Sequence, residues 1–275
     1  MAALEAIPTW PVAHAAGGWL DRSGRQEVAG PTDRTFELAS VTKPIFAYAV
    51  LVAIEEGTLR LDQPLGPGRS TVRHLLAHAS GLPPEIGGPT AEPETRRIYS
   101  NAGFELLGDA LSQASGMSAA DYVALAVSEP LGLRRTSIGS NPAHGGTSSV
   151  EDLLLLLAEW LEPTLIHPAT MAAATSVAFP DLAGVLPGYG RKVPNPWGLG
   201  FEIRGEKSPH WSGQSNSPET FGHFGRAGTL VWVDPVAGRA AVALADRDFG
   251  PWAMEAWPAL CDAVLAESLV STSAP

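Results

Sequence analysis

The chain has 275 residues, of which 45% are hydrophobic, and a formal net charge of −11. This length is sufficient for one large domain with a sizeable buried core. The acidic balance disfavours binding to nucleic acid or to anionic membranes, because basic surfaces drive both kinds of association. The single cysteine, Cys261, excludes an intrachain disulfide, and its place in an apolar segment predicts a buried structural thiol.

The first residues do not have the pattern of an export signal. Residues 1–20 contain Glu5, Pro8 and Pro11, and they lack both a basic start and a continuous apolar core. Nowhere does the chain approach the roughly 20 uninterrupted apolar residues that a membrane-spanning helix needs. We therefore expect a cytoplasmic protein with no membrane partner.

The N-terminal part of the chain predicts a hairpin followed by a long helix. Residues 17–20 and 26–29 flank a polar turn and are typical of two short strands. Residues 40–56 carry apolar side chains at helical spacing, and Gly57 is placed to end this helix. Pro44 is tolerated in the first turn, because the first backbone amides have no partner within a helix.

The middle of the chain predicts helices, and the C-terminal third predicts mainly strands. Helical periodicity recurs between breaks rich in glycine and proline, at residues 71–78, 101–115, 118–127 and 149–161. Strands are expected at residues 198–204, 228–234 and 239–245, the last two as an antiparallel hairpin, before a final amphipathic helix at residues 251–269.

This order of elements predicts a single α+β domain over residues 1–275. Strands from both ends of the chain would form one antiparallel sheet flanked by helices, with a mainly helical lobe inserted between them. The α/β lobe would comprise residues of about 1–60 plus 168–275, and the helical lobe residues of about 61–167.

The strongest functional signal is Ser40-Val41-Thr42-Lys43 at the start of the first predicted helix. Residues three apart on a helix share a face, so we expect the Ser40 hydroxyl and the Lys43 amine within hydrogen-bonding reach. A serine needs such a neighbour to act as a nucleophile. By itself, however, the tetrapeptide is more often an N-cap serine followed by a solvated lysine.

Two further triplets follow along the chain. Tyr99-Ser100-Asn101 enters a predicted helix and can supply a phenol and an amide beside the Ser/Lys pair. His223-Phe224-Gly225 precedes a predicted strand, which places a histidine and flexible backbone at a sheet edge. Each triplet alone is common, since the first is typical of a core tyrosine with a helix cap and the second of a turn. Their order and contexts together are not common.

With these motifs the sequence resembles the penicillin-recognising serine hydrolases, in particular the class C β-lactamase-like group that includes D-amino-acid peptidases and carboxylesterases. The resemblance covers roughly residues 17–246. The matching segments are residues 38–43, 72–82, 99–103, 130–133 and 222–225. The resemblance implies a β-lactamase-like (penicillin-binding-protein transpeptidase-like) fold, an active site between two lobes, and no cofactor.

The resemblance also implies roles for individual residues. Ser40 would be the acylated nucleophile, Lys43 its activating partner, and Tyr99 the proton shuttle to and from Ser40 and the leaving group. Asn101 would hold Lys43 and a polar group of the substrate. The backbone amides of Ser40 and Arg226 would form the oxyanion hole. A Lys43 cation would favour a Tyr99 phenolate, but whether lysine or tyrosine is the base stays open.

The third motif departs from the Lys-Thr-Gly of many relatives, whose lysine and hydroxyl help to hold a substrate carboxylate. Here His223, Phe224 and Gly225 are expected at the substrate, and Phe224 has no hydroxyl to offer. This change favours neutral, apolar acyl esters over β-lactams or peptidoglycan stems. Arg226, also expected at the substrate, can partly replace the lost charge.

Other aromatic and histidine residues have two interpretations each. Trp197 and Trp211 can line an apolar acyl pocket, although ordinary packing is the commoner role of such residues. His74 and His78, four apart, have a spacing that zinc sites use, but no His-Glu-x-x-His pattern accompanies them. The family resemblance explains both histidines as structural, so no metal site is expected.

The sequence therefore predicts a serine hydrolase that cleaves small carboxylic esters or related amides through an acyl-Ser40 intermediate. The alternative activities are those of a D-aminopeptidase, a D,D-peptidase or a weak β-lactamase, because one fold hosts several acyl transfers. An alternative of another class is a catalytically silent binding homologue, against which the intact Ser40, Lys43, Tyr99 and Asn101 argue. The oligomeric state is not predicted.

Overall fold

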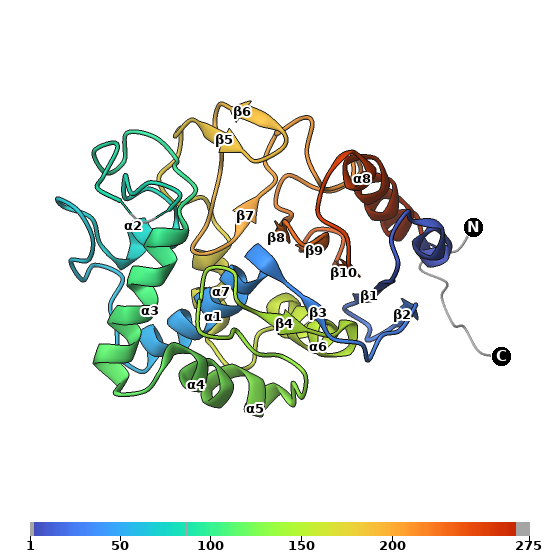
Figure 1. Cartoon of the computed structure of the whole chain (residues 1–275), viewed down its shortest axis with the longest axis horizontal. Coiled ribbons are helices and arrows are strands. Elements are labelled where there is room, and N and C mark those ends of the chain that lie inside the picture. Colours follow the sequence, from blue (N-terminus) through green and yellow to red (C-terminus); the bar gives the residue numbers. More distant parts are fainter. Residues whose placement is uncertain (1–2, 86, 268–275) are drawn as a thin grey trace.

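A six-stranded antiparallel sheet forms the centre of the computed structural model, which describes residues 3–85 and 87–267 (Figure 1). The strands lie in the order β2-β1-β10-β9-β8-β7. Their bounds are β1 (Ala15–Asp21), β2 (Gln26–Ala29), β7 (Glu202–Ile203), β8 (Phe221–Gly225), β9 (Thr229–Asp234) and β10 (Arg239–Ala245). Because β1 pairs with β10 inside the sheet, strands from both ends of the chain lie side by side, which confirms the predicted α+β class.

Helices cover both faces of the sheet and gather at one end of the molecule. Their bounds are α1 (Thr42–Glu55), α2 (Val72–Leu76), α3 (Asn101–Ser115), α4 (Ala119–Val123), α5 (Glu129–Leu131), α6 (Val150–Leu161), α7 (Pro168–Ala174) and α8 (Pro251–Ala266). Figure 1 shows α2 and α3 at the end away from α8. α6 lies within the range expected for the helical lobe but packs on β1, β9 and β10. The division into two lobes stays a prediction.

Alternate side chains of the central strands enter two separate hydrophobic cores. Val231 and Val233 of β9 belong to the core that contains α1 and α6, whereas Leu230 and Trp232 belong to the core beneath α8. A period of two is the pattern of a strand whose two faces are both covered. The sheet is therefore a rigid layer, and one end of it can position backbone groups for a site.

The helix α1 is buried on all sides. Every residue from Thr42 to Ala53 is buried, as expected for a helix that is hydrophobic around its whole circumference. It begins two residues later than predicted, after a 3-10 turn at Ala39–Val41, and Pro44 lies in its first turn as predicted. This burial carries the Lys43 side chain into the interior.

Two predicted hairpins are confirmed, and one predicted strand is much shorter than expected. β1 pairs with β2, and β9 pairs with β10 through a tight connection. The strand expected at residues 198–204 is reduced to β7, because Gly200 has a φ of 89° and interrupts the extended backbone. A side chain at Gly200 would lie 2.1 Å from the Cβ atom of Ala47 in α1, so close packing on α1 also requires glycine there.

The triplet His223-Phe224-Gly225 belongs to a strand that was not predicted, but it lies at a free sheet edge as expected, because only Phe221 and Gly222 of that strand pair with β7. It forms the last three residues of β8 and pairs with β9 on one side only. The helix expected at residues 71–78 ends at Leu76, and His78 has a φ of 54°. α8 ends at Ala266, and residues 268 and 269 of the predicted helix lie outside the described residues.

Two smaller expectations concern Cys261 and the membrane. Cys261 is buried in α8 as predicted, and burial raises the pKa of its thiol to about 12. None of the helices in the described residues is long and apolar enough to cross a membrane.

The packing of α6 on the sheet predicts that two leucines of this helix differ greatly in how much their replacement by alanine destabilises the protein. Leu157 is fully buried, so Leu157→Ala should lower the free energy of unfolding by about 2–5 kcal/mol through a cavity under the sheet. Leu155 is 47% exposed, and Leu155→Ala should change it by less than about 0.5 kcal/mol. Urea denaturation measures both, and equal losses would contradict this packing.

Candidate active site

The turn that carries Ser40 is clamped between segments that are distant in sequence. Ala39 has a φ of 45°, which is unusual for a residue with a side chain, and the 3-10 turn then turns the chain into α1. The Leu38 carbonyl accepts a hydrogen bond from the Thr229 hydroxyl of β9 at 2.8 Å, and the Leu38 amide donates to the Gly146 carbonyl at 2.8 Å. The half-buried Ser40 is thereby held at the junction of the sheet and the helical block.

The Lys43 amine lies 3.5 Å from the Ser40 hydroxyl and is hydrogen-bonded to two fixed acceptors. Its Nζ donates to Asn101 Oδ1 at 2.6 Å and to the Ala143 carbonyl at 2.7 Å. Burial lowers the pKa of Lys43 to about 7, and this shift is only partly opposed by the carboxylates of Glu85 and Glu105.

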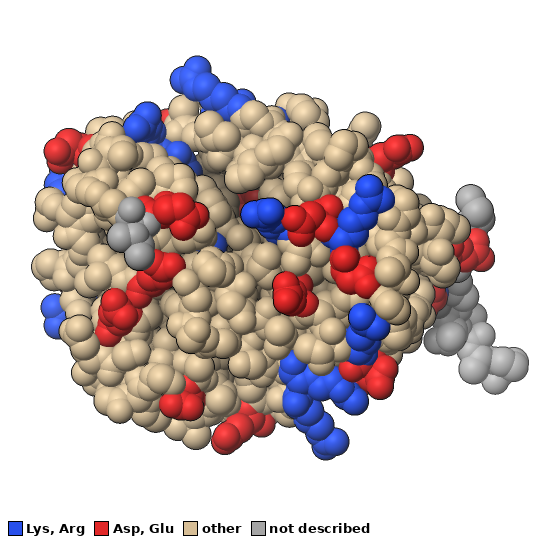
Figure 2. Space-filling model, in the orientation of Figure 1, with Lys and Arg blue, Asp and Glu red and all other residues tan. Residues whose placement is uncertain are grey.

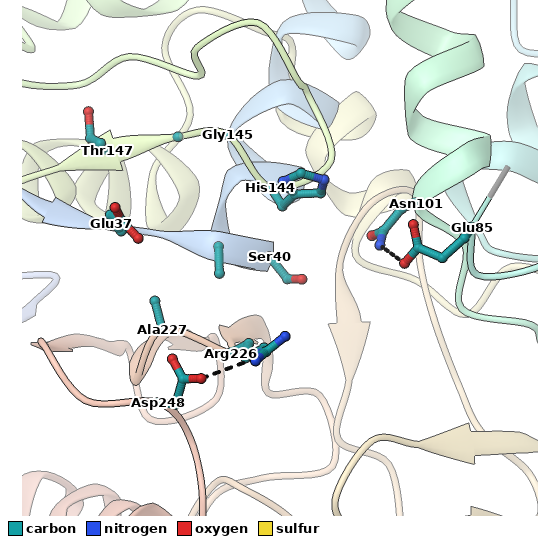
Figure 3. A pocket seen from close by; sticks show the side chains of 12 residues that line it. Glu37, Ser40, Glu85, Asn101, His144, Gly145, Thr147, Arg226, Ala227 and Asp248 are labelled. Atoms are coloured by element: carbon teal, nitrogen blue, oxygen red, sulfur yellow. Dashed lines mark hydrogen bonds and ion pairs between the residues drawn. The ribbon is translucent and has the colours of Figure 1, made fainter.

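The two acceptors determine where the lone pair of a neutral Lys43 points. A neutral amine has two N–H bonds, and an amide oxygen and a backbone carbonyl can only accept. When both N–H bonds are directed to Asn101 and Ala143, the lone pair is left for the Ser40 hydroxyl. Asn101 is itself oriented, because its Nδ2 donates to Glu85 Oε1 at 3.0 Å (Figure 3).

Tyr99 packs against Lys43 and has a buried hydroxyl. Lys43 Nζ lies 4.6 Å from the centre of the Tyr99 ring, and the Tyr99 hydroxyl has no hydrogen-bond partner among the described residues. Burial raises the pKa of Tyr99, and the nearby Ser40 hydroxyl opposes this only in part. The expectation that Lys43 favours a phenolate is therefore wrong, because desolvation of the phenolate outweighs any attraction to the lysine.

A set of aromatic rings encloses Tyr99. His78, Trp197 and His223 lie with their ring centres 4.7, 5.9 and 5.7 Å from that of Tyr99. His78 Nδ1 accepts from the Ser100 backbone amide at 3.1 Å, so this histidine positions the Tyr99 segment. His74 instead pairs with Glu94 at 2.9 Å. The two histidines considered for a zinc pair thus have different partners.

His223 is neutral at ordinary pH, so it does not replace the cation of a Lys-Thr-Gly motif. Its Nδ1 lies 2.6 Å from the Phe224 carbonyl, which can only accept, so Nδ1 carries the proton. Burial, with a further contribution from Lys43, lowers the pKa of His223 to about 4. Its Nε2 is then an unprotonated acceptor.

Arg226 lies at the mouth of the site, not at its base. Its side chain is 86% exposed and pairs with Asp248 at 3.2 Å. The backbone amides of Ser40 and Arg226 donate no hydrogen bond to any other described residue. The Ser40 amide belongs to the 3-10 turn before α1, and the Arg226 amide comes directly after β8. Both amides are therefore available to a ligand.

An apolar cavity of about 250 Å³, called the acyl cavity below, adjoins Ser40 and Tyr99. Leu186, Pro187, Trp197, Phe224 and Phe249 contribute most of its apolar wall, and Glu202 and His223 also line it. Trp197 therefore lines an apolar pocket next to Ser40, one of the two roles considered for it from the sequence. Trp211 does not line this cavity, because its indole N–H donates to Glu202 Oε2 at 2.7 Å from behind.

A wider cleft of about 660 Å³, the outer cleft, leads to Ser40 from solvent. Figure 3 shows Ser40 between the Arg226–Asp248 pair and the Asn101–Glu85 pair. Glu37 also lines this cleft, so its rim carries three carboxylates and one guanidinium. Figure 2 shows acidic and basic side chains close together near the middle of this face. Such a rim disfavours an anionic group in the outer cleft.

Glu202, which sequence reasoning missed, is the centre of a buried polar cluster beneath the acyl cavity. Glu202 Oε1 accepts from Lys207 at 2.5 Å and lies 3.0 Å from His210 Nε2. Burial alone would raise the pKa of Glu202, but Lys207 and His210 hold it well below its usual range. Its place between Phe201 and Ile203 in an apolar run was the sequence signal that could have indicated a buried carboxylate.

Comparisons with known proteins agree with this architecture. The Beta-lactamase family model matches residues 2–264. A crystal structure of a beta-lactamase from Mycobacterium bovis is 51% identical, with a TM-score of 0.95 over 96% of this chain and 98% of that one. A penicillin-binding protein of Bacillus subtilis (strain 168) is 31% identical over 39% of this chain and 31% of its own length.

A further relative carries an esterase name. Esterase EstB of Burkholderia gladioli is 41% identical over 24% of this chain and 20% of its own length. The chain thus matches only about a fifth to a third of the length of these two curated relatives.

The Glu202 cluster predicts a strong effect on stability. Glu202→Ala should lower the free energy of unfolding by about 3–5 kcal/mol, because it leaves the Lys207 ammonium buried without its carboxylate. Urea denaturation measures this loss, and Glu206→Ala, at an exposed carboxylate nearby, should have little effect. The double variant Glu202→Leu/Lys207→Met should recover a large part of the loss. Equal stability of Glu202→Ala and the parent would contradict the paired state of this cluster.

Proposed function

Because the chain belongs to the beta-lactamase family, we propose that it is a serine hydrolase that cleaves small carboxylic esters through an acyl-Ser40 intermediate. The fold is the β-lactamase-like fold that the sequence resemblance implied. The observation that carries the proposal is the buried Lys43 amine, with a pKa of about 7, beside the Ser40 hydroxyl. A nucleophilic serine needs such a base within reach.

In the proposed first step, neutral Lys43 takes the proton of Ser40 while Ser40 Oγ attacks the ester carbonyl. The negative charge that develops on the carbonyl oxygen is stabilised by the backbone amides of Ser40 and Arg226. Tyr99, whose phenol stays protonated because its pKa is raised, donates its proton to the leaving oxygen. The proton on Lys43 then returns to Tyr99.

In the second step a water molecule attacks the acyl-Ser40 ester and releases the carboxylic acid. Lys43 again accepts the proton, and Ser40 Oγ regains one as it leaves. As in acylation, the proton is first removed from the attacking oxygen, and a proton is then given to the leaving oxygen. Asn101 holds Lys43 in both steps, because its Oδ1 keeps one N–H bond directed away from Ser40.

The surroundings of Ser40 support an ester with an apolar acyl group. The acyl cavity has a predominantly hydrocarbon wall, and neutral His223 offers no cation to a carboxylate next to the reacting carbonyl. The carboxylates at the rim of the outer cleft disfavour an anion on that side as well. A β-lactam is the second candidate substrate, because the Mycobacterium bovis relative carries the name beta-lactamase. A cytoplasmic location stays a prediction.

Removal of the nucleophile tests the proposal directly. With p-nitrophenyl esters of graded chain length, Ser40→Ala should reduce kcat/KM by at least about 10³-fold, because no acyl-enzyme can form. A fluorophosphonate probe should label the parent protein at Ser40, as located by mass spectrometry. A chromogenic cephalosporin, assayed in parallel, measures β-lactam hydrolysis and so compares the second candidate substrate with the esters. Unchanged ester turnover in Ser40→Ala, or an adduct on another residue, would refute the proposal.

The pH profile tests which group is the base. Lys43 must be neutral to accept a proton, so kcat/KM should rise with pH through about 7 and then level off. The raised pKa of Tyr99 keeps the phenol protonated over this range, so no decrease is expected between pH 7 and 9.

Lys43→Arg supplies the matched control, because arginine keeps the charge but is never deprotonated in proteins. It should lower kcat/KM by about 10²–10⁴-fold at every pH. A pH-independent rate between pH 6 and 8, or an active Lys43→Arg variant, would exclude Lys43 as the base and leave Tyr99.

A further inference from the structure

A second groove, of about 740 Å³, shares Tyr99 and Pro187 with the acyl cavity. We call it the arginine groove, because Arg96, Arg97 and Arg191 line it together with Ile98 and Val185. Tyr99 thus lies between the acyl cavity at Ser40 and a groove lined by arginines. The outer cleft, with its three carboxylates, adjoins Ser40 instead.

Backbone pairing brings the three arginines of the groove together. Arg97 forms a parallel bridge with Gly184, and its amide donates to the Ala183 carbonyl at 2.8 Å. Gly184 begins β5 (Gly184–Leu186), which pairs with β6 (Gly190–Lys192), and in that pair Val185 lies opposite Arg191. The arginine groove therefore has a floor of paired backbone segments.

The arginines of the groove differ in their partners. The guanidinium of Arg97 is buried and donates to the backbone carbonyls of Ala77 and Asn195, among others, so it is part of the floor. Arg96 is exposed and donates only to the Thr90 carbonyl at 3.2 Å. Arg191 is exposed, and its side chain has no hydrogen bond or ion pair among the described residues.

Arg96 and Arg191 form no ion pair among the described residues, although acidic residues outnumber basic ones in the chain by 29 to 18. Among the described residues no carboxylate lines the arginine groove, whereas most other exposed arginines lie beside one, as Arg60 does beside Asp62 at 3.2 Å. The groove therefore has a positive potential within a molecule of net negative charge. The guanidinium group suits carboxylates in particular, since it can donate two parallel hydrogen bonds to them.

We propose that the arginine groove binds an anionic group at the far end of the substrate, remote from the ester carbonyl. The inference rests on the proposed esterase function of Ser40. The apolar walls at Ile98 and Val185 fit a hydrocarbon segment, and Arg96 and Arg191 fit a terminal carboxylate beyond it. The substrate class is therefore an ester of a dicarboxylic acid, with one carboxyl group esterified and the other free.

Matched pairs of substrates test this inference. The p-nitrophenyl monoesters of adipic, suberic and sebacic acid are compared with the same compounds in which the free carboxylate is a methyl ester. For at least one chain length the free acid should have the higher kcat/KM. Arg191→Ala and Arg96→Ala should each lower the ratio of kcat/KM for acid over methyl ester by about tenfold, the loss of one charged hydrogen bond.

Control variants separate this subsite from general electrostatics. Arg60→Ala removes the same charge from an exposed position outside the groove, and it should leave the ratio unchanged. Arg191→Lys should lose less than Arg191→Ala, because it retains the charge but not the paired donors. Far-UV circular dichroism verifies that the variants fold, which is expected because both arginines are exposed.

A ratio at or below one for every chain length, or one unaffected by Arg191→Ala, would overturn the inference. A binding measurement that needs no turnover supplies the second readout. Titration of Ser40→Ala with monomethyl suberate should show tighter binding than with dimethyl suberate, and equal affinities would also overturn the inference. If turnover depends on Ser40 but shows no carboxylate preference, only this inference fails. If turnover does not depend on Ser40, the proposed function fails.

Discussion

The site depends on the burial of one amine. Lys43 projects from a helix with no exposed face, and removing an ammonium from water is costly enough to bring its pKa down to about 7. Each unit of that change corresponds to about 1.4 kcal/mol, so the protein carries several kcal/mol of destabilisation at this position. The burial of α1 in the core that it shares with α6 and one face of the sheet offsets this cost. Burial in the core thus lowers the pKa of Lys43 enough for it to act as a base at neutral pH.

The same low-dielectric surroundings determine the state of every other titratable group near Ser40. Burial keeps Tyr99 protonated and His223 uncharged, whereas Glu202 stays ionised only because Lys207 and His210 lie against it. Apart from Lys43, whose pKa of about 7 leaves it partly protonated, the groups at the reacting centre are therefore neutral at pH 7, and the other charges lie below it or at the rim. An apolar acyl group meets no unpaired charge there, and charge selection is left to groups further away.

Local spacing explains what could be predicted and what could not. The approach of Lys43 to Ser40 follows from helical geometry, and the hairpins follow from alternating apolar residues. In contrast, Gly200 shortens a predicted strand at its start and packs on Ala47 of another element, and Glu202 is buried by partners that follow it across a loop. Such contacts join segments whose distance in space cannot be read from local patterns.

The phenolate expectation for Tyr99 failed for the same reason. It counted the nearest charge, Lys43, but not the burial of the Tyr99 hydroxyl, and burial had the larger effect on the pKa. The strand β8, which contains the third motif, was not predicted, because glycines at positions 222 and 225 are not typical of a strand. In the structure Gly225 permits close approach, since a Cβ atom there would lie 2.2 Å from the Leu38 carbonyl oxygen. The glycine at this position of β8 therefore lets the strand pack against the turn that carries Ser40.

That close approach indicates how the fold couples its parts to the site. Leu38 is held by Thr229 of the sheet, Lys43 by Ala143 before α6, and Asn101 begins α3. Three segments that are far apart in sequence must all be in place before the Ser40 hydroxyl meets an oriented lone pair. A change in any one of them moves a reacting atom without altering the others, and orientation errors of about 1 Å can cost about 10²-fold in rate. Activity is therefore a more sensitive measure of this junction than global stability.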